Sequence, residues 1–390
     1  MVGGNAFVLL SCMREYVPDV LISGGGIAGL VLANALQQEG LQVTLLEAAE
    51  YPRHRVCGEF ISTEVLPYLH SLDLPIDNLS PVRINTFELS STGNRRLKTH
   101  LDMEALGISR FALDLFLKER AEKKGVKVIE KAEVLGHHAE ANLNHLVDRS
   151  GQEYSAPWYI SAHGKRSRLD NHFNRSFLAD TQLFTGIKMH FKGQWPQNSV
   201  ALHNFRGGYA GISAVEGERI NVSYLVKTKE LQAAGGLQPF QEMVMHKNKA
   251  LFSFFNTHEP VFEEPLAISG IRFGKKQPVQ DSVPFVGDAT GLVAPLFGNG
   301  MALAVRTAHL LHSAMRTVDF KSENKTQVLK MYQALWNKEV RGRLALSRGI
   351  QQVFGRPGIS DLALMGAKAL PFALRYVLAH SHGKPILPHA

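Results

Sequence analysis

Residues Val20 to Glu47 read VLISGGGIAGLVLANALQQEGLQVTLLE, and this stretch decides the fold. A short apolar run enters a glycine-rich turn, good helix formers follow, and a second apolar run ends at Glu47. In such a unit Gly24 permits the tight turn, Gly26 lets a pyrophosphate approach the backbone, and Gly29 lets helix and strand pack closely. The free N–H groups at the start of the helix attract phosphate. The pattern therefore predicts a strand–turn–helix–strand unit that binds a dinucleotide, with Glu47 placed to accept hydrogen bonds from a ribose.

The composition is that of an ordinary soluble globular protein of 390 residues, enough for about two or three domain-sized units. Two cysteines, Cys12 and Cys57, form no disulfide framework and fit a reducing compartment, so we expect a cytoplasmic location. The apolar run from Phe7 to Leu10 has no basic residue before it, which argues against a signal peptide. The first dozen residues are expected to be loose, and either Met1 or Met13 can be the start of the protein.

The formal net charge of +8 is concentrated near the C-terminus. From Asp319 to Ala390 there are eleven Lys and Arg against four Asp and Glu. Nucleic-acid binding is not expected, because no recognition motif accompanies this charge. A solvated helix face is the plainer interpretation. The apolar stretch Ile359 to Leu378 leaves open a peripheral contact with an anionic membrane surface.

The middle of the chain has the pattern of antiparallel strands. Two alternating runs, Ile84 to Leu89 and Arg96 to Leu101, flank a turn and predict a hairpin. Between about residues 176 and 271, short strands alternate with turn signals, and one helix-like stretch runs from Pro239 to Phe255. This predicts a mostly antiparallel sheet inserted into the α/β unit.

A second segment of interest follows Glu47 and contains two arginines and the turn Cys57-Gly58-Glu59. Arg53 and Arg55 are placed to meet phosphate or a flavin edge. A lone cysteine is more often a small buried residue than a reactive thiol, so Cys57 is a weak catalytic candidate. The pair His137 and His138 lacks the spacing of metal ligands, and we expect no metal site.

Three motifs together resemble one family. They are the glycine-rich turn with its downstream acid, a helix start at Arg110-Phe111-Ala112-Leu113-Asp114, and a late Gly287-Asp288 loop that leads into Pro295 to Met301. Over about Val20 to Val318 the chain resembles the flavoprotein superfamily of p-hydroxybenzoate hydroxylase and geranylgeranyl reductase. The Cys-Gly-Glu turn resembles the branch that holds geranylgeranyl reductases and related flavin monooxygenases.

The resemblance implies an α/β fold with a Rossmann-like FAD-binding domain of the glutathione reductase type. An antiparallel β-sheet substrate domain is inserted in it, and a helical C-terminal region follows. The expected FAD-binding parts are residues 17–81, 102–170 and 276–320. The expected substrate domain comprises the hairpin 82–101 and the sheet 171–275, and the C-terminal region covers 321–390.

The resemblance also implies FAD as cofactor and assigns residues to its parts. FAD is too long for one strand–helix turn to hold both ends, so a second glycine-rich turn must return beside the first. Arg110 would lie near the pyrophosphate or the ribityl chain, and Asp288 would hold the ribityl hydroxyls. The remaining assignments are Gly24, Gly26, Ile27, Ala28, Gly29 and Glu47 at the ADP half, Val134 at the adenine, and Pro295, Gly298, Asn299, Gly300 and Met301 at the isoalloxazine.

The chain departs from the family pattern in three places. His163-Gly164 stands where Asp-Gly, a motif often tied to NAD(P)H, is frequent, and this departure leaves the reductant open. Tyr209 to Ser213 lacks the Trp and Pro that prenyl reductases tend to carry in the substrate sheet. The tryptophans at positions 158, 195 and 336 do not form the Trp-x-Trp signature of flavin halogenases.

These observations predict an FAD-dependent oxidoreductase with a small, lipophilic or aromatic substrate. The first hypothesis is an NAD(P)H-dependent monooxygenase, in which NAD(P)H is a transient reductant because no second nucleotide fold is visible. The second is a reductase of C=C bonds in a prenyl or other lipid chain. The third is a non-catalytic flavin-binding protein. No catalytic acid or base can be named beyond the weak candidates Cys57 and Tyr209.

Overall fold

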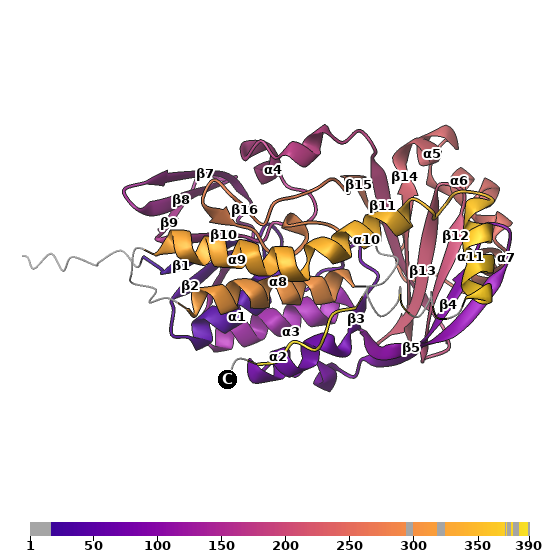
Figure 1. Ribbon diagram of the computed structural model, residues 1–390, viewed down its shortest axis with the longest axis horizontal. Helices are drawn as coiled ribbons and strands as arrows, with labels where there is room; N and C mark the ends of the chain where they lie inside the picture. The colour runs from indigo at the N-terminus through magenta and orange to yellow at the C-terminus, as the bar shows by residue number, and fades with distance from the viewer. Residues whose placement is uncertain are drawn as a thin grey trace, which may run out of the picture.

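The glycine-rich stretch forms β1 (Val20–Ser23), α1 (Ile27–Gln38) and β2 (Val43–Leu46), as predicted. The structure, a computed structural model, describes residues 17–293, 299–317, 324–370, 372, 376 and 382–388. Every residue of β1 and β2 is buried, because both faces of their sheet are covered. These two strands form the centre of the α/β part of the molecule (Figure 1).

The parallel sheet has four strands in the order β10-β1-β2-β6, with β6 at Lys127–Ile129 and β10 at Trp158–Ser161. Side chains on one face, such as Val20 and Ile22, pack against three helices: α1, α3 (Arg110–Lys123) and α8 (Gly300–Met315). Leu21 points to the other face, toward a three-stranded layer. That layer consists of β7 (Val134–Glu140), β8 (Leu143–Asp148) and β9 (Glu153–Ala156).

The second part is an eight-stranded sheet in the order β15-β11-β14-β13-β12-β4-β5-β3, here called the large sheet. Its pairings are antiparallel except for the parallel pair β12 and β4. The predicted hairpin is confirmed as β4 and β5, which pair antiparallel. The strands are β3 (Phe60–Ser62), β4 (Val82–Ser90), β5 (Arg96–Gly107), β11 (Phe184–Lys192), β12 (Ser199–Phe205), β13 (Gly208–Val215), β14 (Arg219–Lys227) and β15 (Leu266–Ile271).

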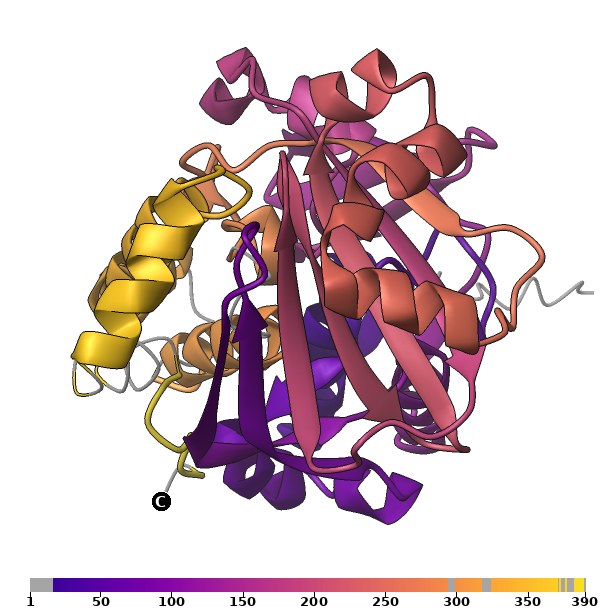
Figure 2. The ribbon, with the colours of Figure 1, turned by 90° about the vertical axis from the view of Figure 1, so that its right-hand side faces the viewer.

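Short helices cover the outer face of the large sheet (Figure 2). They are α5 (Thr228–Ala233), α6 (Leu237–Met243) and α7 (Lys249–Thr257). The predicted helix-like stretch from Pro239 to Phe255 is therefore helical over most of its length, but it is divided between α6, a short 3₁₀ helix and α7. The chain leaves the helical path before Asn248, whose side chain accepts hydrogen bonds from the N–H groups of Ala250 and Leu251 and so starts a new helix.

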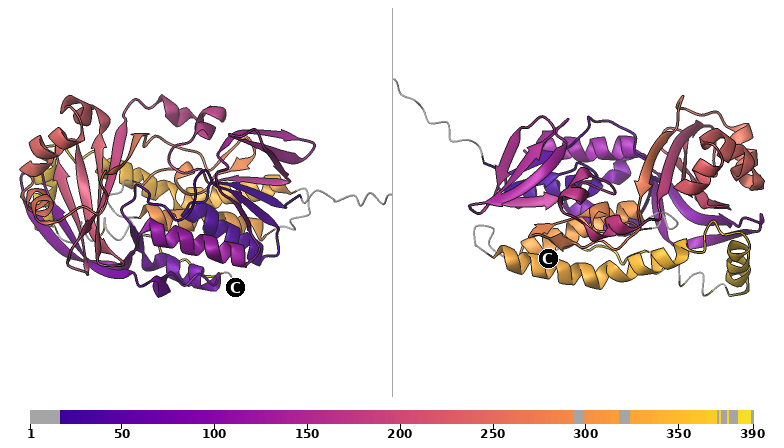
Figure 3. Two further views of the ribbon diagram at one scale, coloured as in Figure 1. Left: turned by 180° about the vertical axis from the view of Figure 1, so that it is seen from behind. Right: turned by 90° about the horizontal axis from the view of Figure 1, so that it is seen from above.

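Smaller elements complete the chain. Beside the two sheets lie α2 (Leu66–Ser71), α4 (Arg168–His172), β16 (Val279–Gln280) and β17 (Val283–Pro284). The C-terminal helices α9 (Lys325–Glu339) and α10 (Arg341–Gln351) run from the α/β part to the large sheet (Figure 3). Helix α11 (Ile359–Ala369) lies at the far end, where Asp361 accepts a 2.6 Å hydrogen bond from Ser91. None of the helices in the described residues has the length and apolar character that crossing a bilayer requires.

The packing of α1 against β1 depends on Gly29. A Cβ atom added at this position would lie 2.0 Å from the carbonyl oxygen of Gly24, which is backbone and cannot rotate away. We predict that Gly29→Ala lowers the free energy of unfolding by about 2 kcal/mol, as overpacking in a buried contact does. Urea denaturation measures this change.

Gly366 in α11 provides the matched control, because a Cβ atom added there would meet no heavy atom within 4 Å. Gly366→Ala is expected to leave stability unchanged or to raise it by up to about 1 kcal/mol, the helix-propensity difference. Equal effects of the two substitutions would contradict the close packing of α1 on β1.

Candidate functional site

A cavity of about 500 Å³ lies between the carboxyl end of the parallel sheet and the inner face of the large sheet. Ser23, Leu46 and Ala162, which end or follow β1, β2 and β10, line one end. Side chains from β4, β5, β12, β13, β14 and β15 line the other. Ligands of open α/β sheets bind beyond the carboxyl ends of the strands, so this is the expected place for a cofactor.

Two turns that are distant in sequence meet at this cavity. Gly24 has φ of +106°, and a Cβ atom there would lie 2.4 Å from the carbonyl oxygen of Ala162. Gly287, in the late loop, has φ of +66°, and its added Cβ would lie 2.9 Å from the Cβ of Ala28 at the start of α1. The missing side chains therefore let the two turns and β10 approach one another.

The N-terminus of α1 faces the cavity without a side-chain cap. Gly26 is its N-cap residue, makes no side-chain hydrogen bond, and no acidic residue stands in the first turn. Helix N-termini carry partial positive charge and free N–H groups, which bind phosphate. An added Cβ at Gly26 would meet nothing nearer than the Nη2 atom of Arg110, at 3.6 Å, so the backbone is open toward the cavity.

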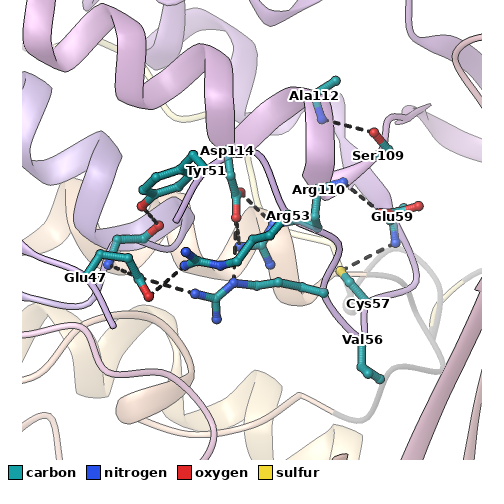
Figure 4. Close-up of polar contacts among 12 residues, drawn as sticks. Glu47, Tyr51, Arg53, Val56, Cys57, Glu59, Ser109, Arg110, Ala112 and Asp114 are labelled. Carbon is teal, nitrogen blue, oxygen red and sulfur yellow. Dashed lines mark hydrogen bonds and ion pairs between the residues drawn. The ribbon is translucent and has the colours of Figure 1, made fainter. Parts of the chain in front are cut away.

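Arg110 is fixed in place by Asp114 one turn further along α3. Its Nε and Nη2 atoms donate to the two oxygens of that carboxylate at 2.7 and 2.6 Å (Figure 4). Burial alone would lower the pKa of Arg110, but the Asp114 carboxylate raises it above its usual value. A rigid, charged guanidinium beside the α1 N-terminus suits a diphosphate.

Glu47 lies at the end of β2 and is almost fully buried. Its carboxylate accepts from the Gly25 N–H at 2.7 Å and forms ion pairs with Arg53 at 2.8 Å and Arg55 at 3.3 Å. Tyr51 donates a hydrogen bond to the carbonyl oxygen of Gly25 (Figure 4). The acid therefore organises the glycine turn as well as lining the cavity.

His163 stands at the position where the resembled family often has Asp, and its side chain contacts the carboxylate of Asp170. Its Nε2 atom lies 3.0 Å from Oδ1 of Asp170, and its Nδ1 atom lies 2.8 Å from Oγ of Ser161. Burial lowers the pKa of His163 despite this acid. Nearby, Lys276 donates to the carbonyl oxygen of Asp288 at 3.0 Å, and burial lowers its pKa to about 8.

The turn Cys57-Gly58-Glu59 also reaches the cavity, and it brings residues that the sequence interpretation missed. The carboxylate of Glu59 contacts Lys188 and His190 of β11, and all three side chains are fully buried. Residues two apart in a strand share a face. In the sequence, the only indication of this cluster was that Lys188 and His190 lie two apart in a strand that is otherwise largely apolar.

Most of the predicted site residues line the cavity, although their roles toward a cofactor stay predictions. Gly29 and Asn299 are buried beside it, and Asn299 accepts a hydrogen bond from Ser62 at 2.9 Å. Pro295 and Gly298 lie outside the described residues. Those that line the cavity are Gly24, Gly26, Ile27, Ala28, Glu47, Arg55, Cys57, Arg110, Val134, Tyr209, Asp288, Gly300 and Met301.

Comparison with known proteins identifies the family. The family described as "FAD binding domain" matches residues 18–337, most of the chain. The chain belongs to this family.

Named relatives agree with this membership. Menaquinone reductase of Mycobacterium tuberculosis is 22% identical over 311 residues, which cover 75% of this chain and 75% of that protein. Digeranylgeranylglycerophospholipid reductase 1 of Methanopyrus kandleri is 25% identical over 354 residues, covering 86% and 90%. Among solved structures, halogenase PltM in complex with phloroglucinol and FAD has a TM-score of 0.71 at 18% identity, covering 93% of this chain and 84% of that one. The protein is an FAD-dependent oxidoreductase.

The residues present fit FAD. The uncapped α1 N-terminus and Arg110 would hold the two phosphates, and Glu47 and Val134 lie at the end of the cavity suited to adenosine. Asp288 lines the same cavity and would accept hydrogen bonds from the ribityl hydroxyls. When bound, the flavin supplies hydride chemistry that no side chain can perform.

Arg110 offers a direct test of the phosphate site. Arg110→Lys replaces the planar guanidinium, which can donate two hydrogen bonds to one phosphate, with an ammonium. We predict that this change weakens FAD binding by about tenfold. Isothermal titration calorimetry of FAD-free protein measures the dissociation constant. Arg120→Lys on the same helix is the control, because Arg120 makes an exposed ion pair with Asp73. Equal losses in both variants would contradict the placement of Arg110 at the phosphates.

Proposed function

We propose that this FAD-dependent oxidoreductase reduces carbon–carbon double bonds in the isoprenoid chain of a lipid. The main support for the proposal is that the part of the cavity lined by the large sheet is apolar. In the described strands, the large sheet contributes no charged side chain to the lining. The apolar side chains on this inner face are Phe60, Phe87, Leu101, Val200, Leu202, Leu225, Ile268 and Ile271.

An apolar lining discriminates between substrate classes. A site for a polar aromatic acid or a phenol carries buried polar groups that pair with the substrate. When a hydrocarbon binds there instead, these groups lose their hydrogen bonds, so the site selects strongly against it. Here the inner face of the sheet offers hydroxyls from Tyr209, Ser213 and Ser223, and otherwise hydrocarbon, whereas the Tyr224 hydroxyl accepts from Gln241 of α6 on the outer face. Such a lining favours a long hydrocarbon chain.

The relatives support the same reaction class. The two reductases compared above, which match most of this chain, are named for a quinone and a phospholipid that carry prenyl chains. They support a prenyl-chain substrate here. They outweigh the monooxygenase hypothesis, which rests on the shared fold.

Different residues of the cavity would bind the cofactor and the substrate. The phosphate and ribityl contacts orient the cofactor, while the apolar strands hold the lipid chain and exclude water. Reduction of a double bond also needs a proton. Cys57 and Tyr209 line the cavity with groups that can hold a proton, at Sγ and at the hydroxyl. NAD(P)H is the proposed source of electrons.

An anaerobic experiment tests the proposed function. The FAD-loaded protein is reduced with dithionite and, separately, with NADPH or NADH, and then mixed with a geranylgeranylated glycerophospholipid, whose headgroup does not itself accept electrons. We predict that the lipid reoxidises the flavin without O₂ and gains two hydrogen atoms, measured by absorbance and mass spectrometry. The same lipid with a saturated chain is the control and should leave the flavin reduced.

The monooxygenase hypothesis gives the opposite result. The flavin would stay reduced with every prenyl lipid until O₂ is admitted, and the product would carry one added oxygen atom. That outcome would overturn the proposed reduction.

We also propose that α11, together with Phe372, makes a peripheral contact with an anionic membrane surface. Leu362 is 68% exposed, and Phe372 beyond the helix is 70% exposed. The exposed basic residue Arg356 precedes Leu362, and the exposed Lys368 lies between Leu362 and Phe372. Apolar side chains with basic neighbours are the composition of an interfacial helix.

Co-sedimentation with vesicles tests this contact. We predict that Leu362→Glu reduces binding to phosphatidylglycerol-containing vesicles by about tenfold, because it places a charge in the apolar face. Leu387→Glu is the control, since Leu387 is 69% exposed but follows Ile386, whose N–H donates to the carbonyl oxygen of Glu64 in the α/β part of the molecule. Binding that is equally strong in both variants, or absent from the parent protein, would contradict the contact.

A further inference from the structure

A cluster of three fully buried ionisable side chains lies between the Cys57 turn and the large sheet. One carboxylate oxygen of Glu59, Oε1, accepts from the Lys188 ammonium, and the other, Oε2, lies 2.6 Å from Nε2 of His190. Oε1 also accepts from the backbone N–H of Arg110 at 2.7 Å. Glu59 thus joins the turn, β11 and the start of α3.

Burying three ionisable side chains together costs more free energy than filling the same space with apolar side chains. Replacing a buried ion pair by apolar side chains of similar volume is often neutral or stabilising, whereas removal of one partner is strongly destabilising. Burial by itself would raise the pKa of Glu59, but the hydrogen bond from His190 and the charge of Lys188 hold it below its usual value. Stability alone does not account for three ionisable groups here.

The cluster does not have the character of a metal site. Ligand atoms of His54, Glu59 and His190 lie within 4.8 Å of one another, a spacing that a metal ion can bridge. The Lys188 ammonium, however, already neutralises Glu59, and it would repel a second cation.

The same turn is held from several sides. Glu59 has φ of +52°, a backbone conformation that non-glycine residues seldom adopt. Its N–H points to the Sγ atom of Cys57 at 3.5 Å (Figure 4). Asn221 of β14 donates to the carbonyl oxygen of Cys57 at 3.3 Å, and Lys165 donates to that of Val56 at 2.9 Å.

These contacts fix where Cys57 lies. Cys57 and Glu59 line the cavity between the end suited to FAD and the apolar large sheet. We propose that Glu59, held by Lys188 and His190, is a positioning residue that fixes the Cys57 thiol where the flavin and the substrate meet. The inference deepens the proposed function, because that function assigns both ligands to this cavity.

Alkylation of Cys57 tests the inference without any lipid substrate. The assay uses full-length, FAD-loaded protein carrying Cys12→Ser, so that Cys57 is its single cysteine. Iodoacetamide labelling is followed by mass spectrometry across a range of pH. Glu59→Gln is expected to change the labelling rate by about tenfold, because the released turn alters the exposure and surroundings of the thiol.

Glu64→Gln is the matched control for loss of stability. The Glu64 side chain is also fully buried and pairs with Arg306 at 3.7 Å and Arg343 at 3.4 Å, but it does not line the cavity. Both variants should lower the melting temperature, whereas Glu64→Gln should leave the labelling rate within about twofold of the parent. Equal changes of labelling rate in the two variants would overturn the inference.

A double variant separates position from stability. Glu59→Gln with Lys188→Met removes both charges and should regain much of the melting temperature that Glu59→Gln loses. The labelling rate should remain altered, because the carboxylate that orients the turn is still absent. Return of the parent's labelling rate would show that the cluster serves stability alone and would overturn the inference. Failure of the lipid-reduction experiment would leave this test intact.

Discussion

The structure depends on the absence of side chains where β1 turns into α1. Gly24 lies against the carbonyl of Ala162, Gly29 lies against the carbonyl of Gly24, and Gly287 lies against Ala28. A Cβ atom at any of these positions would push apart the strand, the helix and the late loop. Their contact aims the N-terminus of α1 into the cavity and brings Asp288 to the same place. A cofactor held at both ends requires this convergence.

Charge and hydrocarbon are separated along the cavity. Glu47, Arg55, Arg110 and Asp288 line the end formed by the α/β part, and the large sheet lines the other end with apolar and hydroxyl side chains. An extended cofactor with a charged middle and a flat, redox-active ring suits such a gradient. A lipid chain on the sheet side would exclude water from the reacting atoms. The turn at Cys57 and Glu59 stands at the boundary between these two environments.

Local patterns in the sequence predicted much of this arrangement. The glycine turn, the hairpin of β4 and β5 and the inserted sheet all follow from periodicity and turn residues within short stretches. The chain does enter a sheet and helices where these patterns placed them, except that Asn248 divides the stretch from Pro239 to Phe255. A capping side chain can outweigh a run of helix formers, because it satisfies N–H groups that otherwise lack partners.

Contacts between distant residues escaped prediction. Glu59 meets Lys188 and His190 across more than a hundred residues of sequence, and no local pattern indicates which acid a buried lysine will find. His163 pairs with Asp170 only seven residues later, at the start of α4, but the family's Asp-Gly pattern did not predict this pairing. Such pairs become visible only once the sheet registers and helix positions are known.

One FAD molecule should span the two turns at Gly24 and Gly287. A crystal structure of the protein with FAD measures this directly. We predict the adenosine beside Glu47 and Val134, the phosphates at the N-terminus of α1, and the isoalloxazine between Cys57 and Met301, facing the apolar strands of the large sheet. FAD bound elsewhere, or an isoalloxazine turned away from these strands, would contradict this prediction.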